Sequence, residues 1–417
     1  MNDLAIAQDI VNFATIAIEN GGWMDMDRLY LQNRIKTLIG YTDEFDSANL
    51  QTVIEDASTL AKRLVDSSFE KKSSKKINEY DYHKKLLDLL DLLTPPTSVV
   101  NALFAQHYSK SPKEATDYFY QLNKTNQTIQ NEFFVSKNCE EESIDGYTLC
   151  RVHVANENIK DYPFLQRVTS TLPYSFELEG YCGNTTEEIL TSRRIIRMNL
   201  QGESYGFQFL KDAFVPEHCV VVAEKEESRS LRNQLDHVTQ LVEIFPDYFM
   251  MGNLEIVSEN EDQLHCVDQQ YQGGRLQFPV LNAQMKSKHT VPLFPEVVLE
   301  KLDWPITIWR LKSTNRQELV KAAEYLIRGG LQGDGFDDDF LLKQSDGQAQ
   351  NALLMVVKRQ NGYELYVGCH SKEDVTLVNG MGAFGLFLSS NQVTKEKVAF
   401  KHEVQQVLSD LRKWFNG

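Results

Sequence analysis

The chain has 417 residues, 42% of them hydrophobic and 24% charged, which is enough for two or three domains with cores of their own. Asp and Glu outnumber Lys and Arg by 59 to 43, giving a formal net charge of −16. So acidic a chain argues against nucleic acid as a partner, because nucleic-acid binding depends on cationic contacts with phosphates. A nucleotide-sized ligand needs only a few local cations and backbone donors and is not excluded.

No apolar run approaches the roughly 20 residues that a membrane-spanning helix needs, and the first residues lack the basic-then-apolar order of a signal peptide. We therefore expect a cytoplasmic protein that does not contact a membrane. The cysteines are scattered with no Cys-X-X-Cys pair, so we expect buried free thiols and no zinc or redox site. They are Cys139, Cys150, Cys182, Cys219, Cys266 and Cys369.

Residues 1–125 are expected to form a helical region. Apolar residues recur at helical spacing over Ile6–Ile18, and Gly21-Gly22 ends that pattern. Pro95-Pro96 interrupts a later stretch, because proline breaks the interior of a helix. The other helices expected here are Arg28–Leu38, Asn49–Leu64, Tyr80–Leu93, Thr97–His107 and one that begins at Pro112.

From about Asn126 the hydrophobic period changes to that of strands. Arg194–Leu200 and Phe207–Phe209 flank a turn with Gly202 and predict a hairpin, and Asn361-Gly362 predicts a second one. Further strands are expected over Glu217–Val222, Leu302–Leu311, Gln350–Val357 and Tyr363–Val367, and further helices over Leu231–Phe245, Asn315–Leu326 and Lys401–Phe415.

The segment Val267–Phe278 combines a polar cluster with two adjacent glycines. Gly273 and Gly274 lack a Cβ, so a ligand or another backbone can approach them closely. The alternating apolar residues that follow, from Leu276 to Val280, predict a half-buried strand. On these residues alone, a turn that leads into a strand is the simplest interpretation.

The same segment resembles the active-site strand of the hexose-1-phosphate uridylyltransferases, in the bacterial class with a long amino-terminal helical region. That family carries His-X-His-X-Gln-Gly-Gly, in which the second His attacks the α-phosphorus of a UDP-sugar and the Gln holds phosphoryl oxygens. Gln272, Gly273 and Gly274 match the Gln-Gly-Gly. Gln270 stands at the position of the nucleophile, and Asp268 at that of the first His.

The resemblance implies further site residues. Arg194 aligns with a family Arg and Asn351 with a family Asn, so both are candidates for binding the substrate with Gln272 and the two glycines. The positions of the family's metal ligands hold other residues: Leu172 and Ser175 replace a Cys-X-X-Cys pair, and Glu226 replaces a His. We therefore expect neither a metal nor a cofactor.

The fold implied by the resemblance is α+β. A helical region over 1–125 would precede two histidine-triad-like mixed or antiparallel sheet units, duplicated half-barrels at 126–280 and 281–417, with the degenerate active-site strand in the first. The resemblance also implies a homodimer. It is strongest over Leu92–Leu122, Arg194–Val222 and Tyr271–Phe278.

A glutamine at position 270 cannot do the chemistry of the family's nucleophile. The uridylyl intermediate of that ping-pong route forms on a neutral imidazole nitrogen with an available lone pair. The lone pair of the Gln270 amide nitrogen is delocalised into its carbonyl, so the side chain can hydrogen-bond a phosphate but cannot form the intermediate at a useful rate. Losing the nucleophile should cost several orders of magnitude in rate.

Other residues could supply chemistry. His265 could replace the nucleophile only if a β-bulge re-aims it, because a simple strand register places it far from Gln270. His218 and Cys219 are neighbours on a strand and point to opposite faces, which excludes a nucleophile pair.

Three charged or glycine-rich segments have competing interpretations. Arg193, Arg194 and Arg197 form either a uridine-diphosphate anchor or a row of surface salt bridges. Gly380–Gly385 fits Gly-X-Gly-X-X-Gly but lacks the following helix of a dinucleotide site, so we expect it to lead into a strand. Asp334–Asp339 lacks the spacing of a calcium loop and is expected to be a solvated acidic loop.

The sequence leaves three functional hypotheses. In the first, the protein is a uridylyltransferase-like homologue of galactose metabolism that binds UDP-glucose, UDP-galactose or a hexose 1-phosphate, or regulates an active relative, without covalent catalysis. In the second, it is an active enzyme that uses direct transfer or His265. In the third, it is a structural partner that binds no such ligand.

Overall fold

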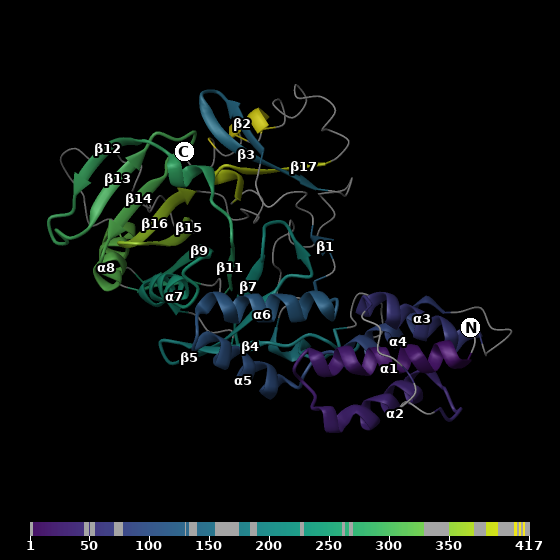
Figure 1. The fold of residues 1–417 in the computed structure, drawn as a ribbon. Coiled ribbons are helices and arrows are strands. Elements are labelled where there is room, and N and C mark those ends of the chain that lie inside the picture. The colour runs from purple at the N-terminus through teal and green to yellow at the C-terminus, as the bar shows by residue number, and fades with distance from the viewer. Residues whose placement is uncertain are drawn as a thin grey trace. The chain divides into compact units, whose positions relative to one another are not determined.

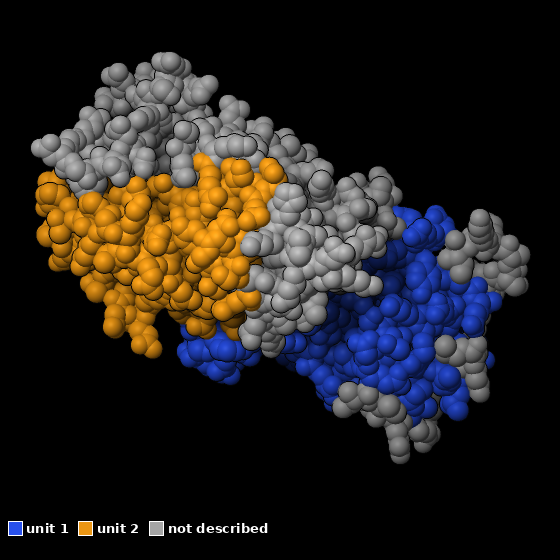
Figure 2. All heavy atoms as spheres, turned by 90° about the horizontal axis from the view of Figure 1, so that it is seen from above, with its two compact units in different colours: residues 1–130, 173–197, 206–211 blue, residues 131–172, 198–205, 212–417 orange. Residues whose placement is uncertain are grey.

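The structure is a computed structural model. It describes the chain apart from residues 1–2, 46–49, 51–54, 71–77, 130, 133–139, 155–174, 184–189, 226–228, 261–262, 267–269, 329–349, 371–380, 391–403, 407, 410–411 and 413–417. The chain forms two compact units, one of residues 1–130, 173–197 and 206–211 and the other of the remaining residues (Figure 2). No helix of the described part is long and apolar enough to cross a membrane.

The first unit contains the helical region that the sequence predicts. Local signals fix the ends of its helices: the Asn78 side chain accepts from the Tyr80 amide, Ser111 accepts from the Glu114 amide, and Gly40 ends a helix at φ 70°. The helices are α1 (Asp3–Glu19), α2 (Arg28–Ile39), α3 (Ala57–Glu70), α4 (Glu79–Asp91), α5 (Thr97–Tyr108) and α6 (Pro112–Thr125).

One helix begins later than expected. Glu55 and Asp56 are not helical, and the Asp56 carboxylate accepts from the Thr59 amide at 2.8 Å, so α3 starts at Ala57 and the expected start at Asn49 is wrong. The capping carboxylate outweighs the apolar periodicity before it.

The second unit contains most of a twelve-stranded sheet (Figure 1). Its main path runs β12-β13-β14-β16-β15-β9-β11-β7-β5-β4, and β8 and β10 pair beside β9. The strands are β4 (Ile196–Leu200), β5 (Glu203–Phe209), β7 (Cys219–Ala223), β8 (Arg229–Ser230), β9 (Phe249–Asn260), β10 (Gln263–Cys266), β11 (Gln270–Gly274), β12 (Met285–Thr290), β13 (Val298–Leu302), β14 (Trp309–Ser313), β15 (Gln350–Arg359) and β16 (Gly362–His370).

The strand order reads the same from both ends of the path. One half runs β4-β5-β7-β11-β9 and the other β12-β13-β14-β16-β15, and β9 pairs with β15 where the halves meet. The helices α7 (Leu231–Ile244) and α8 (Arg316–Ile327) occupy equivalent places in chain order, each before the innermost strand of its half. They lie side by side (Figure 1), where Arg316 of α8 forms a 2.8 Å ion pair with Asp236 of α7.

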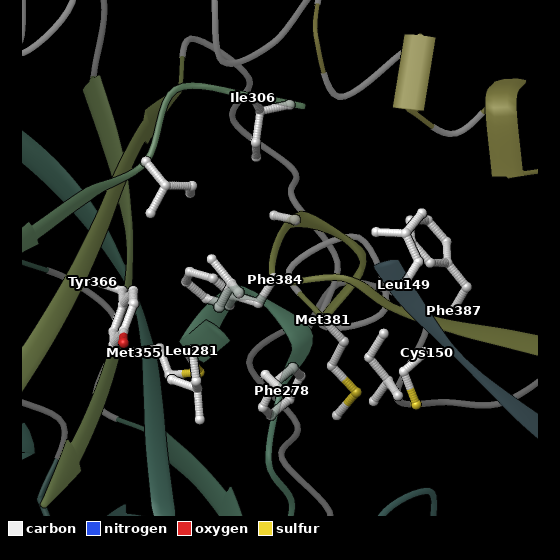
Figure 3. Packing of buried hydrophobic residues seen from close by; sticks show 14 of the residues in the cluster. Leu149, Cys150, Phe278, Leu281, Ile306, Met355, Tyr366, Met381, Phe384 and Phe387 are labelled. Atoms are coloured by element: carbon white, nitrogen blue, oxygen red, sulfur yellow. The ribbon is translucent and has the colours of Figure 1, made fainter. Parts of the chain in front are cut away.

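A large hydrophobic cluster fills the second unit. It joins sheet residues such as Met355 and Tyr366 to Phe278 and Phe384 from the connecting segments (Figure 3). Two smaller sheets complete the fold: β17 (Leu386–Ser390) with β3 (Tyr147–Val154) and β2 (Glu140–Ile144), and β1 (Asn131–Glu132) with β6 (Asp212–Ala213). Strand β17 follows Gly385, which confirms that the Gly380–Gly385 motif leads into a strand.

Two of the expected strands are wrong, and proline explains both. Leu276–Val280 is not a strand, because Pro279 begins a short 3₁₀ helix, η6 (Pro279–Asn282), and the strand of this segment ends at Gly274 and includes both glycines. Leu302–Leu311 is not continuous, because the segment around Pro305 turns the chain between β13 and β14. The hairpins at Gly202 and Asn361-Gly362 are confirmed.

The cysteine expectation holds only in part. Cys219 is a buried free thiol, whereas the free Cys182 is exposed and Cys150 is disulfide-bonded.

Candidate functional site

The Gln-Gly-Gly segment forms β11 inside the sheet. The strand lies between β7 and β9, with Gln272 opposite Val220 on one side and Met251 on the other. Its side chains alternate between the two faces: Tyr271 is 1% exposed, and Gln270 and Gln272 are half-buried. Gln270 and Gln272 therefore share a face of the sheet.

The two glycines are explained by the protein's own packing. A Cβ on Gly273 would lie 2.6 Å from Met250 Sδ and 2.7 Å from the Phe249 carbonyl oxygen. A Cβ on Gly274 would lie 2.9 Å from the Pro216 carbonyl oxygen. Of the two interpretations that the sequence allowed, close approach of another backbone is therefore the one that the structure supports.

The Tyr271 face of the strand is covered by helix α7. The Tyr271 hydroxyl donates to the Gln234 side-chain oxygen of α7. Beside it, the Tyr205 hydroxyl and His237 Nδ1 are 3.0 Å apart, and burial lowers the pKa of His237 to about 4. This face is core, so a ligand of β11 has to approach from the face of Gln270 and Gln272.

On the face that Gln270 and Gln272 share, the Gln272 carboxamide contacts a buried imidazole. His218 is 1% exposed and comes directly before β7, and its Nε2 lies 3.2 Å from Gln272 Oε1. The Phe214 amide donates to His218 Nδ1 at 3.3 Å. Burial lowers the pKa of His218 to about 4, so the ring is neutral near pH 7.

His218 is therefore not a free nucleophile. Both of its ring nitrogens have protein partners, and the side chain is almost fully buried. Cys219 is also fully buried, and burial raises the pKa of its thiol, which suppresses the reactive thiolate. Both residues are therefore buried, and neither is free to act as a nucleophile.

Arg194 lies in the first unit, where protein acceptors surround its guanidinium. Its Nε donates to the Pro95 carbonyl at 2.9 Å, one terminal nitrogen donates to the Thr191 and Arg193 carbonyls at 2.8 and 3.0 Å, and the other bonds Asp91 at 2.8 Å. Only 11% of the side chain is exposed. This geometry favours a structural role for Arg194 over the uridine-diphosphate anchor.

Arg197 is part of the same salt-bridged row. It bonds the Glu179 carboxylate at 2.6 Å and stacks over the Phe176 ring at 4.8 Å. The other oxygen of Glu179 accepts from the Ile195 amide at 2.7 Å and the Thr97 hydroxyl at 3.0 Å. The carboxylate thus ties helix α5 to the start of β4.

The strand register places His265 and Asn351 away from Gln272. His265 pairs with Val257, six residues along β9 from Met251, which is about 20 Å at the usual strand rise. Asn351 pairs with Glu255, four residues from Met251, or about 13 Å. Neither residue's backbone is brought to the Gln272 carboxamide.

A register shift of the kind that the His265 hypothesis required lies close to that residue, because the pairing of β10 with β9 is irregular between Gln263 and Leu264. The distance along β9 remains too long for His265 to reach a phosphorus beside Gln270 and Gln272.

Several predicted positions lie outside the described residues: Asp268, Leu172, Glu226, Gly380 and the acidic loop at 334–339. Across the part of the chain that the structure does describe, no group of three or more His, Cys, Asp or Glu side chains could hold a metal ion.

Sequence reasoning missed the contact between His218 and Gln272. It identified both residues but considered His218 only as a possible partner of Cys219. The two lie 54 positions apart, and the register that pairs β7 with β11 cannot be read from the hydrophobic pattern.

Comparisons with known proteins place the chain in a family. A family model described as the amino-terminal domain of galactose-1-phosphate uridyl transferase matches residues 22–148. The galactose-1-phosphate uridylyltransferase of Staphylococcus saprophyticus is 30% identical over 379 residues, which cover 86% of this chain and 74% of that protein. The chain belongs to the galactose-1-phosphate uridylyltransferase family.

Other members of the family are similarly related. The enzyme of Lactobacillus helveticus is 30% identical over 85% of this chain and 72% of its own length. That of Enterococcus faecalis is 29% identical over 76% of this chain, and the match spans only 65% of the longer relative. Yeast Ap4A phosphorylase Apa2 aligns with 73% of this chain and 97% of its own at a TM-score of 0.43 and 14% identity.

Proposed function

We propose that this family member binds a UDP-sugar through Gln272 and does not carry the uridylyl group covalently. The observation that supports binding is the orientation of the Gln272 carboxamide, whose oxygen faces the buried His218. The amino group at the other end of the carboxamide is then available to donate to phosphoryl oxygens, which only accept.

Gln270 is the reason for proposing that covalent transfer is lost. It lies two residues before Gln272 on the same face of β11, at the family's nucleophile position, and is half-buried. An amide has no lone pair with which to displace a hexose phosphate from the α-phosphorus. The ligands that this proposal implies are UDP-glucose, UDP-galactose or a hexose 1-phosphate.

The proposed role is that of a catalytically impaired homologue that forms a homodimer in the cytoplasm, or that instead regulates or pairs with an active relative. We also propose that the regions at 126–280 and 281–417 are duplicated histidine-triad-like half-barrels. The strand order that repeats from both ends of the sheet supports this division.

Residual activity through His265 is the second candidate, and the register shift between Gln263 and Leu264, beside His265 in β10, favours it. The distance of about 20 Å along β9 from Val257 to Met251 counts against it.

The test combines binding with intact-mass detection. Isothermal titration with UDP-glucose should show binding by the wild-type protein, and intact mass after incubation should show no uridylyl adduct. A Gln270→His variant serves as the matched control, because it restores the imidazole on the same strand. A covalent adduct on the wild-type chain would overturn the proposal, and loss of that adduct in His265→Ala would establish the second candidate.

Absence of any binding heat, together with an unchanged melting temperature in UDP-glucose and hexose phosphates, would instead favour a structural partner. A ligand that binds the native state must raise its stability.

A further inference from the structure

The hydrogen bond between His218 and Gln272 has a defined donor and a defined acceptor. Which is which follows from the segment before β7. The chain from Phe214 to His218 folds tightly: the His218 amide donates to the Val215 carbonyl at 3.2 Å, and Glu217 adopts a left-handed φ of 53°. This fold places the His218 ring beneath the Phe214 amide and beside β11.

The Phe214 contact fixes where the imidazole proton lies. A backbone N–H can only donate, so His218 Nδ1 must accept and carries no proton. The neutral ring then carries its proton on Nε2, which faces Gln272 Oε1 at 3.2 Å. The hydrogen bond therefore runs from the imidazole to the carboxamide oxygen.

We infer that His218 is a positioning residue that orients the Gln272 carboxamide so that its amino group, and not its oxygen, is presented to ligand phosphate. This inference rests on the proposed function of Gln272. A flipped carboxamide would set its amino group against the imidazole N–H, leaving two donors face to face. Because the flipped orientation loses this buried hydrogen bond, the observed orientation should be more populated than the flipped one by roughly tenfold to a hundredfold.

The fixed direction selects for the chemistry of the ligand. In a free glutamine the two ends of the amide exchange, so the side chain can meet either a donor or an acceptor. Held by His218, Gln272 offers only donors to a ligand. Phosphoryl oxygens, as in a nucleoside diphosphate sugar, suit such a site, whereas an ammonium group, which only donates, does not.

Two substitutions of the same residue separate positioning from packing. The amide nitrogen of Gln in His218→Gln reaches about as far as Nε2, so it can still donate to Gln272 but does not replace Nδ1. The shorter Asn in His218→Asn can accept from the Phe214 amide but does not reach Gln272. Each variant keeps one of the two hydrogen bonds of the wild-type ring, so the pair is matched in the number of bonds lost.

The expected result is an affinity for UDP-glucose at least tenfold weaker in His218→Asn, with most of that loss restored in His218→Gln. In a Gln272→Ala background neither substitution should weaken binding further, because the side chain that His218 orients is gone. Nitrogen NMR of ¹⁵N-histidine-labelled wild-type protein should show His218 protonated on Nε2 and unprotonated on Nδ1.

Three results would overturn the inference alone: unchanged affinity in His218→Asn while the wild-type protein binds, equal losses in both His218 variants, or the opposite tautomer. Failure of the wild-type protein to bind UDP-glucose would overturn the proposed function and this inference with it. The two failures are therefore distinguished by the wild-type titration.

Discussion

Two regions of this chain carry polar residues that the family resemblance assigns to the ligand, and they differ in how the protein contacts those residues. Around Arg194, three backbone carbonyls and the Asp91 carboxylate receive hydrogen bonds from the guanidinium. Around Gln272, the described residues make one side-chain hydrogen bond, between the buried His218 and the carboxamide oxygen. The donors of Arg194 therefore already bond the protein. Gln272 is held by its carboxamide oxygen.

The difference shows what distinguishes a binding residue from a structural one. A side chain whose donors already bond the protein must lose those bonds before it can bind a ligand. A side chain held at its acceptor end keeps its donors for the ligand and loses little entropy on binding. Motif position alone does not separate the two cases.

The largest expected effect is that of acid on the stability of the region around Gln272, because two buried histidines flank β11. The pKa values of His218 and His237 are lowered from 6.5 to about 4 by burial, so the unfolded chain binds more protons than the folded one between these values. Stability is then greatest above pH 6.5 and falls as the pH drops towards 4, by roughly 3 kcal/mol for each histidine. Denaturant titrations from pH 7 to 4.5 measure this loss of stability, and a double variant with Gln at both positions should lose that pH dependence. An unchanged pH dependence in the double variant would show that His218 and His237 are not its source.

Removing the guanidinium should destabilise the first unit. Burial raises the pKa of Asp91 and Arg194 offsets part of that rise, so Arg194→Ala leaves a half-desolvated carboxyl and three carbonyls without their donor. We expect a loss of about 3 kcal/mol, measured by denaturant unfolding, with UDP-glucose affinity unchanged.

Arg197→Ala is the control for that experiment, because Arg197 is 44% exposed and should contribute about 1 kcal/mol or less. If Arg194→Lys folded normally but lost ligand affinity, the guanidinium would belong to the binding site after all.

Two glycine-to-alanine substitutions test how tightly β11 packs against its neighbours. Gly273→Ala would place a methyl group 2.7 Å from the Phe249 carbonyl oxygen, whereas in Gly252→Ala the nearest atom is a Tyr271 ring carbon at 3.2 Å. We expect losses of about 2–3 kcal/mol for the first and less for the second, from thermal or denaturant unfolding. Equal stability of Gly273→Ala and the wild type would mean that the glycine serves a ligand and not the fold.

The smallest expected effect is on affinity. Gln272→Ala removes a donor to a charged phosphoryl oxygen and should weaken UDP-glucose binding by roughly tenfold to a hundredfold in calorimetry. Gln272→Glu is the matched isostere: it still accepts from His218 but presents negative charge to the phosphate, so it should bind more weakly than the alanine variant. Wild-type affinity in Gln272→Glu would place the phosphate elsewhere.

The helices could be read from the sequence because their signals are local. Ser111 and Asn78 cap helices within three residues of their partners, and Pro112 suits a first turn. The hairpin at Asn361-Gly362 is equally local, with Gly362 at φ 146°. Where these local signals competed with apolar periodicity, as at Asp56, the cap decided the boundary.

The site could be read only in part, because its geometry depends on pairings between distant strands. Resemblance identified Gln270 and Gln272, and alternation along β11 puts both on one face. The reason for Gly273 and Gly274 lies in Phe249 and Pro216, and the orientation of Gln272 depends on His218. None of these partners is marked by spacing, since strand register is set by the folded sheet.

The tight fit of Gly273 and Gly274 against neighbouring carbonyls bears on the proposal that this chain binds its ligand without group transfer. These contacts constrain the path of the strand one and two residues beyond Gln272. Position 270, which the resemblance assigns to the nucleophile, lies at the other end of β11. The proposed loss of transfer would therefore leave the part of the strand that carries Gln272 in place, as a folded receptor for the same nucleotide.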